Sequence, residues 1–171
     1  MNALNEYGEL KATQVFSAGA VAGILAGSAM AIFLMLLAMI AGEGFWLPLK
    51  KISVTLLGES AIQNSVFELL PVIVGILIHF ATAIAFGIVF AFIEERRQSY
   101  SSAVRAGIIY GLNVWIIMHF LVLPVINPVL AGMPYLLFAI LHIIFGGTLG
   151  GYVTFLPTRA EVRAEISRRV A

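Results

Sequence analysis

The stretch ATQVFSAGAVAGILAGSAMAIFLMLLAMIAG runs from Ala12 to Gly42 without a charged residue. A transmembrane helix needs about 20 predominantly apolar residues to cross the hydrocarbon core. Two further uncharged stretches follow, from Leu69 to Ile93 and from Ala106 to Thr158. The last is too long for one helix and is interrupted by prolines. We therefore predict an all-α, four-helix transmembrane bundle with spans at about 15–41, 71–93, 106–124 and 135–156.

The composition agrees with a membrane location. Of the 171 residues, 61% are hydrophobic and 11% are charged, and the mean hydropathy is +1.01. A soluble domain averages about 45–50% apolar and about 25% charged residues. We expect a single integral membrane domain over residues 1–171, in contact with the lipid bilayer. The net charge of +1 argues against a nucleic-acid partner.

Two residue types that enzymes often use are missing from the chain. It has no Cys, which excludes disulfides, thiolate metal sites and cysteine nucleophiles. All of its acidic residues are Glu, so no Asp is present to complete a Ser-His-Asp triad. We therefore expect no independent catalysis.

The distribution of Lys and Arg predicts the orientation. Cytoplasmic loops carry an excess of these residues. With four spans, Lys50 and Lys51 lie on one side, and the other side has all the rest: Lys11, Arg96, Arg97, Arg105, Arg159, Arg163, Arg168 and Arg169. We predict a multi-pass protein of a bacterial-type inner (plasma) membrane, with both termini cytoplasmic. The 43–70 loop is then external, and the 158–171 tail is cytoplasmic.

The external loop contains an amphipathic segment. Leu49, Ile52 and Leu56 fall on one face of a helix, which predicts a short helix lying in the outer interface.

The second and fourth spans share a spacing. Pro71, His79 and Gly87 are separated by eight residues each, as are Pro134, His142 and Gly150. We interpret the chain as two helical-hairpin repeats that enter the membrane in the same direction, related by an axis along the membrane normal. The alternative is two independent hairpins with the general features of membrane helices.

Small residues recur at intervals of four in the predicted spans. They allow close approach of helix backbones, an important source of packing energy in lipid. We predict helix packing at these glycines, within the chain or against other membrane subunits or a second copy: Gly19, Gly23, Gly27, Gly75, Gly87, Gly107, Gly111 and Gly150.

All three histidines, His79, His119 and His142, lie in predicted spans, where an ionisable residue is a functional hypothesis by default. His79 and His142 are a candidate axial pair for haem b, with Ala83 and Gly146 leaving room for the ring. All three imidazoles together are a candidate Cu or Zn site. Proton transfer or hydrogen bonding to a quinone is a third hypothesis. The alternative is neutral histidines bonded across helix interfaces.

The order of these features resembles small bacterial four-helix inner-membrane proteins of the YagU-like kind. The resemblance rests on the Gly-rich first span, Gly75 with His79, Trp115 followed by Leu123-Pro124, and His142 with Gly146. It implies a topology and no activity.

These observations lead to three functional hypotheses. We expect a small integral membrane subunit or accessory protein that packs through its glycines and carries a ligand at an outer-leaflet His cluster. The alternative is a haem-b or metal-binding redox or quinone-interacting membrane protein. A small transporter or channel is the third, disfavoured because no charged residue lies within a span.

Overall fold

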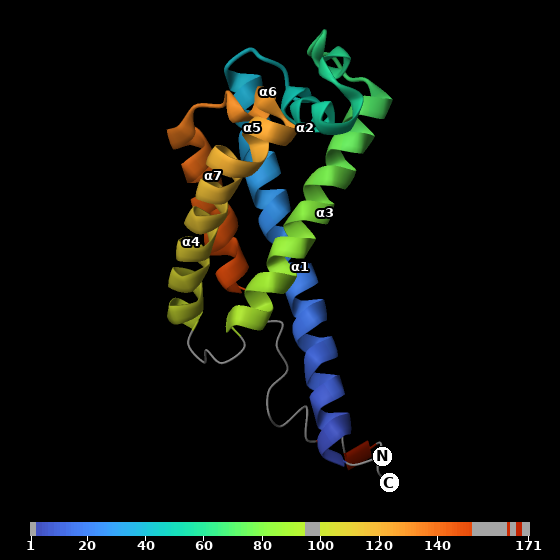
Figure 1. Ribbon diagram of the computed structural model, residues 1–171, viewed down its shortest axis with the longest axis vertical. Coiled ribbons are helices and arrows are strands. Elements are labelled where there is room, and N and C mark those ends of the chain that lie inside the picture. Colours follow the sequence, from blue (N-terminus) through green and yellow to red (C-terminus); the bar gives the residue numbers. More distant parts are fainter. Residues whose placement is uncertain (1–2, 95–99, 152–163, 165–166, 169–171) are drawn as a thin grey trace.

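The computed structural model describes residues 3–94, 100–151, 164 and 167–168, and every regular element in these ranges is helical (Figure 1). The all-α prediction is therefore confirmed. The elements in order are α1 (Ala3–Ile40), α2 (Leu47–Leu57), the 3₁₀ turn η1 (Glu59–Ile62), α3 (Leu69–Glu94), α4 (Tyr100–Ile117), the π-helical turn η2 (Met118–Val122), α5 (Leu123–Ile126), α6 (Pro128–Ala131) and α7 (Tyr135–Leu149).

Three helical segments are long and apolar enough to cross a membrane: Ala12–Ile40, Leu69–Glu94 and Tyr100–Ile126. They correspond to the first three predicted spans, and the third continues two residues beyond the predicted end at 124. The predicted fourth span, 135–156, contains the shorter apolar helix α7 and then continues past residue 151, outside the described residues. The predicted tail also lies outside them, except for residues 164, 167 and 168.

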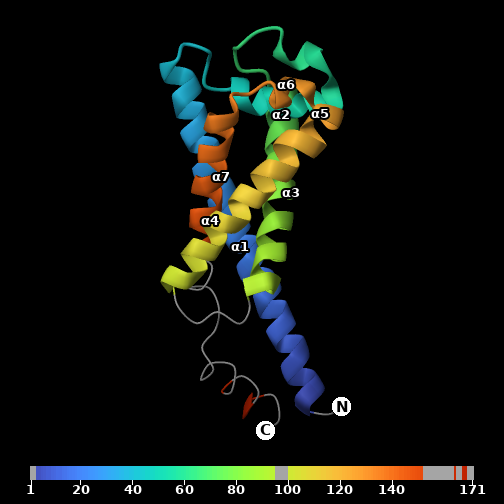
Figure 2. The same ribbon diagram turned by 60° about the vertical axis from the view of Figure 1, so that its left-hand side comes forward.

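The long helices alternate in direction and pack as two pairs (Figures 1 and 2). Helix α1 packs along α3, α4 packs along α7, and α1 also packs along α7, so that α1 and α7 join the pairs. Helices α3 and α4 make little contact with each other. The chain returns to the same end after each pair, while α2, α5 and α6 cover the opposite end.

Close backbone contacts hold the α1–α3 pair together. A Cβ atom added to Gly19 would lie 2.8 Å from the carbonyl oxygen of Gly87, and one added to Gly23 would lie 2.5 Å from that of Ala83. Such distances are shorter than van der Waals contact, so only glycine allows these helices to approach so closely. The predicted packing role of these glycines agrees with the contacts.

The α4–α7 pair is built in the same way. Added Cβ atoms at Gly107 and Gly111 would clash with the carbonyl oxygens of Gly146 and His142, respectively. Gly150 meets the backbone of Val104 equally closely. The described glycines in both pairs therefore face helices of this chain.

Gly75 has a different partner from the others. An added Cβ there would clash with the carbonyl oxygen of Leu49, which lies in α2. Gly75 thus holds the short helix against α3, instead of joining two long helices as its position in a span suggests.

Where α4 continues into η2 and α5, the backbone hydrogen-bonding pattern changes just before Pro124. Proline has no backbone N–H, and its ring displaces the carbonyl one turn earlier. The backbone N–H of Leu123 donates to Met118, five residues back, which is the π-helical pattern. His119 lies within this widened turn.

The predicted short helix is present as α2, but its apolar residues do not share one environment. Leu49 is 4% exposed, whereas Leu56 is 71% exposed. The two ends of this face therefore differ in burial within the protein. Helix α2 packs on α3 through a face that contains Lys50, Ser53 and Val54 as buried residues.

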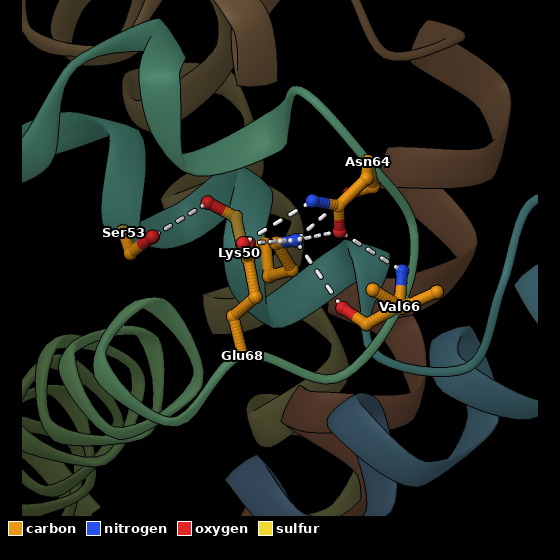
Figure 3. A network of polar contacts seen from close by, with 5 residues as sticks. All are labelled: Lys50, Ser53, Asn64, Val66 and Glu68. Carbon is orange, nitrogen blue, oxygen red and sulfur yellow. Dashed lines mark hydrogen bonds and ion pairs between the residues drawn. The ribbon is translucent and has the colours of Figure 1, made fainter.

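Residues 42–68, together with α5 and α6, form the covered end of the molecule (Figure 1) and are called the cap. Lys50 is the centre of a polar network in the cap, although its side chain is fully buried (Figure 3). Its Nζ donates to the carbonyl oxygens of Asn64 and Val66 at 2.8 and 3.2 Å and to Asn64 Oδ1 at 3.0 Å. It also forms an ion pair with Glu68, immediately before α3. A buried ammonium ion needs such partners, so this network fixes the 59–68 loop onto α2.

Asn127 links the cap to the second helix pair. This fully buried residue accepts a hydrogen bond from the backbone N–H of Leu130 at 3.1 Å and so caps α6. Its Nδ2 donates to the carbonyl oxygen of Lys51 and to Thr55 Oγ1, both at 2.9 Å. Asn127 therefore joins α2 to the α5–α6 corner.

Candidate functional site

A cavity of about 160 Å³ lies between the two helix pairs, beneath α2, α5 and α6. Its wall is mostly apolar and includes four methionines, Met30, Met35, Met118 and Met133. The polar side chains that line it are Thr55, Thr82, His79 and His142. An engineered apolar cavity of about 150 Å³ binds benzene or xenon, so a space of this size accommodates a small molecule.

His79 reaches the cavity from α3. Its Nε2 lies 2.9 Å from the carbonyl oxygen of Gly27 on α1. A carbonyl only accepts hydrogen bonds, so Nε2 carries the hydrogen and donates it. This bond crosses the closely packed α1–α3 interface, and it leaves Nδ1 as the acceptor nitrogen of the ring.

His142 reaches the same cavity from α7 and is 5% exposed. Its Nδ1 lies 2.8 Å from the carbonyl oxygen of Phe138, one turn earlier. By the same reasoning, Nδ1 donates and Nε2 keeps its lone pair. The two histidines that share the Pro-His-Gly spacing thus line one cavity from the two helix pairs.

His119 does not line this cavity. The ring of His119 stacks on that of Trp115, with the ring centroids 6.4 Å apart, and its centroid lies 5.7 Å from that of Phe138. The ring centroids of Phe138 and His142 are 4.5 Å apart. The buried Nδ1 of His119 has no hydrogen-bond partner, nor does Nε1 of Trp115. Phe138 therefore contacts both His119 and His142.

The geometry does not assemble the predicted three-histidine metal site. Among the described residues, no group of three or more His, Cys, Asp or Glu side chains is close enough to hold a metal ion. Phe138 contacts both His119 and His142, and His119 does not share the cavity with the other two histidines.

The residues expected to make room for a haem ring have other surroundings. Ala83 lines the cavity but also contacts Gly23 and Gly27 of α1. Gly146 lies against Gly107, outside the cavity wall. A haem is several times larger than benzene, so the cavity does not fit one without separating these helices.

A second hollow of about 270 Å³ adjoins the cavity towards the covered end. Leu34, Pro48 and Met133 line both spaces. The second one is also bordered by Glu43 and Lys51, which form an exposed ion pair at 3.3 Å. These three apolar side chains therefore form the wall between the cavity and a polar surface of the cap.

Sequence patterns did not reveal the role of the cap in this site. Thr55, which lines the cavity, belongs to the loop between the first two spans, and its hydroxyl is held by Asn127. The signals present were a lysine within an apolar segment and the Asn127-Pro128 pair, which is typical of a helix start.

No curated protein and no solved structure matches the chain. A family model does match, over residues 13–164, which include every residue of the cavity wall and of the cap. The chain belongs to this family, which is described as a family of unknown function (DUF6789).

Proposed function

We propose that the protein is a small, non-catalytic integral membrane protein that binds a small lipid-soluble molecule in the cavity between its helix pairs. The observation that carries this proposal is the cavity itself, whose wall is apolar apart from two histidines and two threonines. Ligand sites have this character, with a few placed polar groups in an apolar wall.

The packing of the glycines supports a self-contained site. A partner subunit was expected because small-residue stripes suit helix association. In the described residues, however, the packing glycines face α1, α2, α3, α4 and α7 of this chain. We therefore base the function on the cavity and not on a partner.

The proposal includes a four-helix transmembrane bundle in which α7 belongs to a fourth span. Its support is that α7 packs along α4 and α1, which are long enough to cross the membrane. Both termini are cytoplasmic in this proposal, in a bacterial-type inner membrane, because the positive charges favour that side.

We also propose that the α1–α3 and α4–α7 pairs are parallel repeats. Both pairs join through glycines, and the equivalent residues His79 and His142 line one cavity. Gly107 corresponds to Gly19, because Ala18-Gly19 with Gly23 matches Ala106-Gly107 with Gly111. The contacts differ by one turn: Gly19 meets Gly87, whereas Gly107 meets Gly146, four residues before Gly150, the equivalent of Gly87.

The methionines provide a direct test of binding. Four of the six line the cavity, whereas Met39 is exposed and does not. The protein labelled with [methyl-13C]methionine is titrated with toluene in detergent micelles and followed by NMR. We expect saturable shifts at Met30, Met35, Met118 and Met133 and little change at Met39.

A matched pair of variants identifies the site. Val114→Phe fills the cavity, because Val114 is buried and lines it, and should abolish the saturable shifts. Ile109→Phe places the same ring on the exposed side of α4 and should leave them intact. Equal, non-saturating shifts at all methionines would show partitioning into the micelle and would refute the proposed function.

A further inference from the structure

The hydrogen bonds of the two cavity histidines restrict which ligand the site prefers. Each ring donates its one hydrogen to a backbone carbonyl, at Gly27 for His79 and at Phe138 for His142. A second proton would charge the ring, and no acidic side chain lines the cavity to compensate that charge. An uncompensated charge within a span is costly, so both rings are neutral.

A neutral imidazole that donates through one nitrogen has a lone pair on the other. These nitrogens are Nδ1 of His79 and Nε2 of His142. Within the described residues neither has a hydrogen-bond partner, and neither is among the polar atoms sealed from access. Of the two threonines, Thr82 adds no donor, because its hydroxyl donates to the carbonyl oxygen of Ile78 at 2.8 Å. The hydroxyl of Thr55 accepts from Asn127 Nδ2 at 2.9 Å and lies on the α2 side of the cavity.

From this pattern we infer that the cavity selects an uncharged, hydroxyl-bearing apolar molecule, of the phenol or alcohol class, which donates its O–H to one of the two free imidazole nitrogens. The inference rests on the proposed function and specifies its ligand. A molecule that only accepts hydrogen bonds, such as an ether, finds no donor on the histidines and leaves both lone pairs unpaired. Unpaired polar atoms in an apolar site reduce affinity, so the difference favours the hydroxyl compound.

Three probes of similar size separate the contributions, with the methionine shifts as the measurement. Phenol donates a hydrogen bond, anisole only accepts one, and toluene does neither. The ratio of phenol to anisole affinity is compared between the wild type and the variants, so that partitioning into the micelle cancels. A neutral hydrogen bond contributes about 1 kcal/mol, with a range of about 0.5–1.5. We therefore expect His142→Leu to lower the ratio roughly three- to tenfold.

Two further variants show that the effect comes from the acceptor. His142→Gln keeps a carbonyl oxygen near the position of Nε2 and should retain most of the preference. His119→Leu removes a histidine of the same region that does not line the cavity, and should leave the ratio unchanged.

The outcomes distinguish the inference from the function on which it rests. If toluene, anisole and phenol all fail to give saturable shifts, the proposed function is wrong. If toluene binds, but the phenol to anisole ratio is the same in the wild type, His142→Leu and His142→Gln, the cavity binds apolar molecules and the inferred hydroxyl preference is wrong.

Discussion

At the scale of single residues, two adjacent lysines occupy opposite environments. Lys50 is fully buried among oxygen atoms, whereas Lys51 is partly exposed and pairs at 3.3 Å with an exposed Glu43. Hydrogen bonds to charged groups contribute about 1.5–3 kcal/mol each, whereas a surface ion pair contributes at most about 1 kcal/mol. Lys50 is buried only when the 59–68 loop folds against it. The sequence alone therefore does not distinguish Lys50 from Lys51.

We predict that Lys50→Met lowers the free energy of unfolding by about 2–3 kcal/mol, because it removes a fully buried ammonium group and leaves the carbonyl oxygens of Asn64 and Val66 without their donor. Lys51→Met, the matched control, should change it by less than about 1 kcal/mol. Unfolding in a detergent titration, followed by circular dichroism, measures both. Equal losses of unfolding free energy in the two variants would show that the network around Lys50 stabilises the fold no more than the surface ion pair of Lys51 does.

Glu68 makes the cap sensitive to acid. The hydrogen bond from Lys50, followed by that from Asn64, holds the pKa of the Glu68 carboxyl below its ordinary value of 4.5. A carboxyl with a depressed pKa stabilises the fold above its unfolded pKa, and this contribution is lost as the pH falls through the folded pKa.

We therefore predict that Glu68 contributes a decrease in the midpoint of thermal unfolding below about pH 4.5, and none between pH 7 and about pH 5. In Glu68→Gln this part of the decrease should be absent, because the amide does not titrate. Thermal scans of both proteins across this pH range provide the measurement. If the unfolding midpoint of Glu68→Gln falls in acid by the same amount as that of the wild type, the decrease comes from other carboxyl groups.

At the scale of the helices, two neighbouring glycines of α7 have different roles. An added Cβ at Gly146 would clash with the carbonyl oxygen of Gly107, whereas at Gly147 the nearest atom is Cγ1 of Ile108 at 3.7 Å, an ordinary contact. Backbone atoms cannot move aside as a flexible side chain can. The sequence shows only two consecutive glycines, and the neighbouring helix decides which of them is required.

We predict that Gly146→Ala destabilises the protein by about 1–3 kcal/mol, the usual cost of overpacking. Gly147→Ala should be neutral, or stabilising by up to about 1 kcal/mol, because alanine is the better helix former. Thermal unfolding of the two variants in the same detergent makes the comparison. A larger loss for Gly147→Ala would contradict the observed α4–α7 contact.

At the scale of the whole molecule, the long helices run between two opposite ends, one of which is covered by α2, α5 and α6 (Figure 1). We predict that the end covered by α2, α5 and α6 is external. The chain has no Cys, so single cysteines report on topology without a background. Ser60→Cys, in the exposed part of the cap, should react with a membrane-impermeant maleimide in intact cells. Ser167→Cys should react only after permeabilisation, and labelling from outside would reverse the predicted orientation.

Local length and polarity along the sequence correctly predict the helical class and the first three membrane segments. His79 and His142, which share the repeated spacing, both line one cavity. The position of His119 became clear only in the folded chain: His119 lies in the π-helical turn before Pro124, contacts Phe138 and does not line the cavity. The tertiary structure alone decided the burial of Lys50 and the dimensions of the cavity, since both depend on atoms far apart in the chain that meet only when the cap packs on the helices.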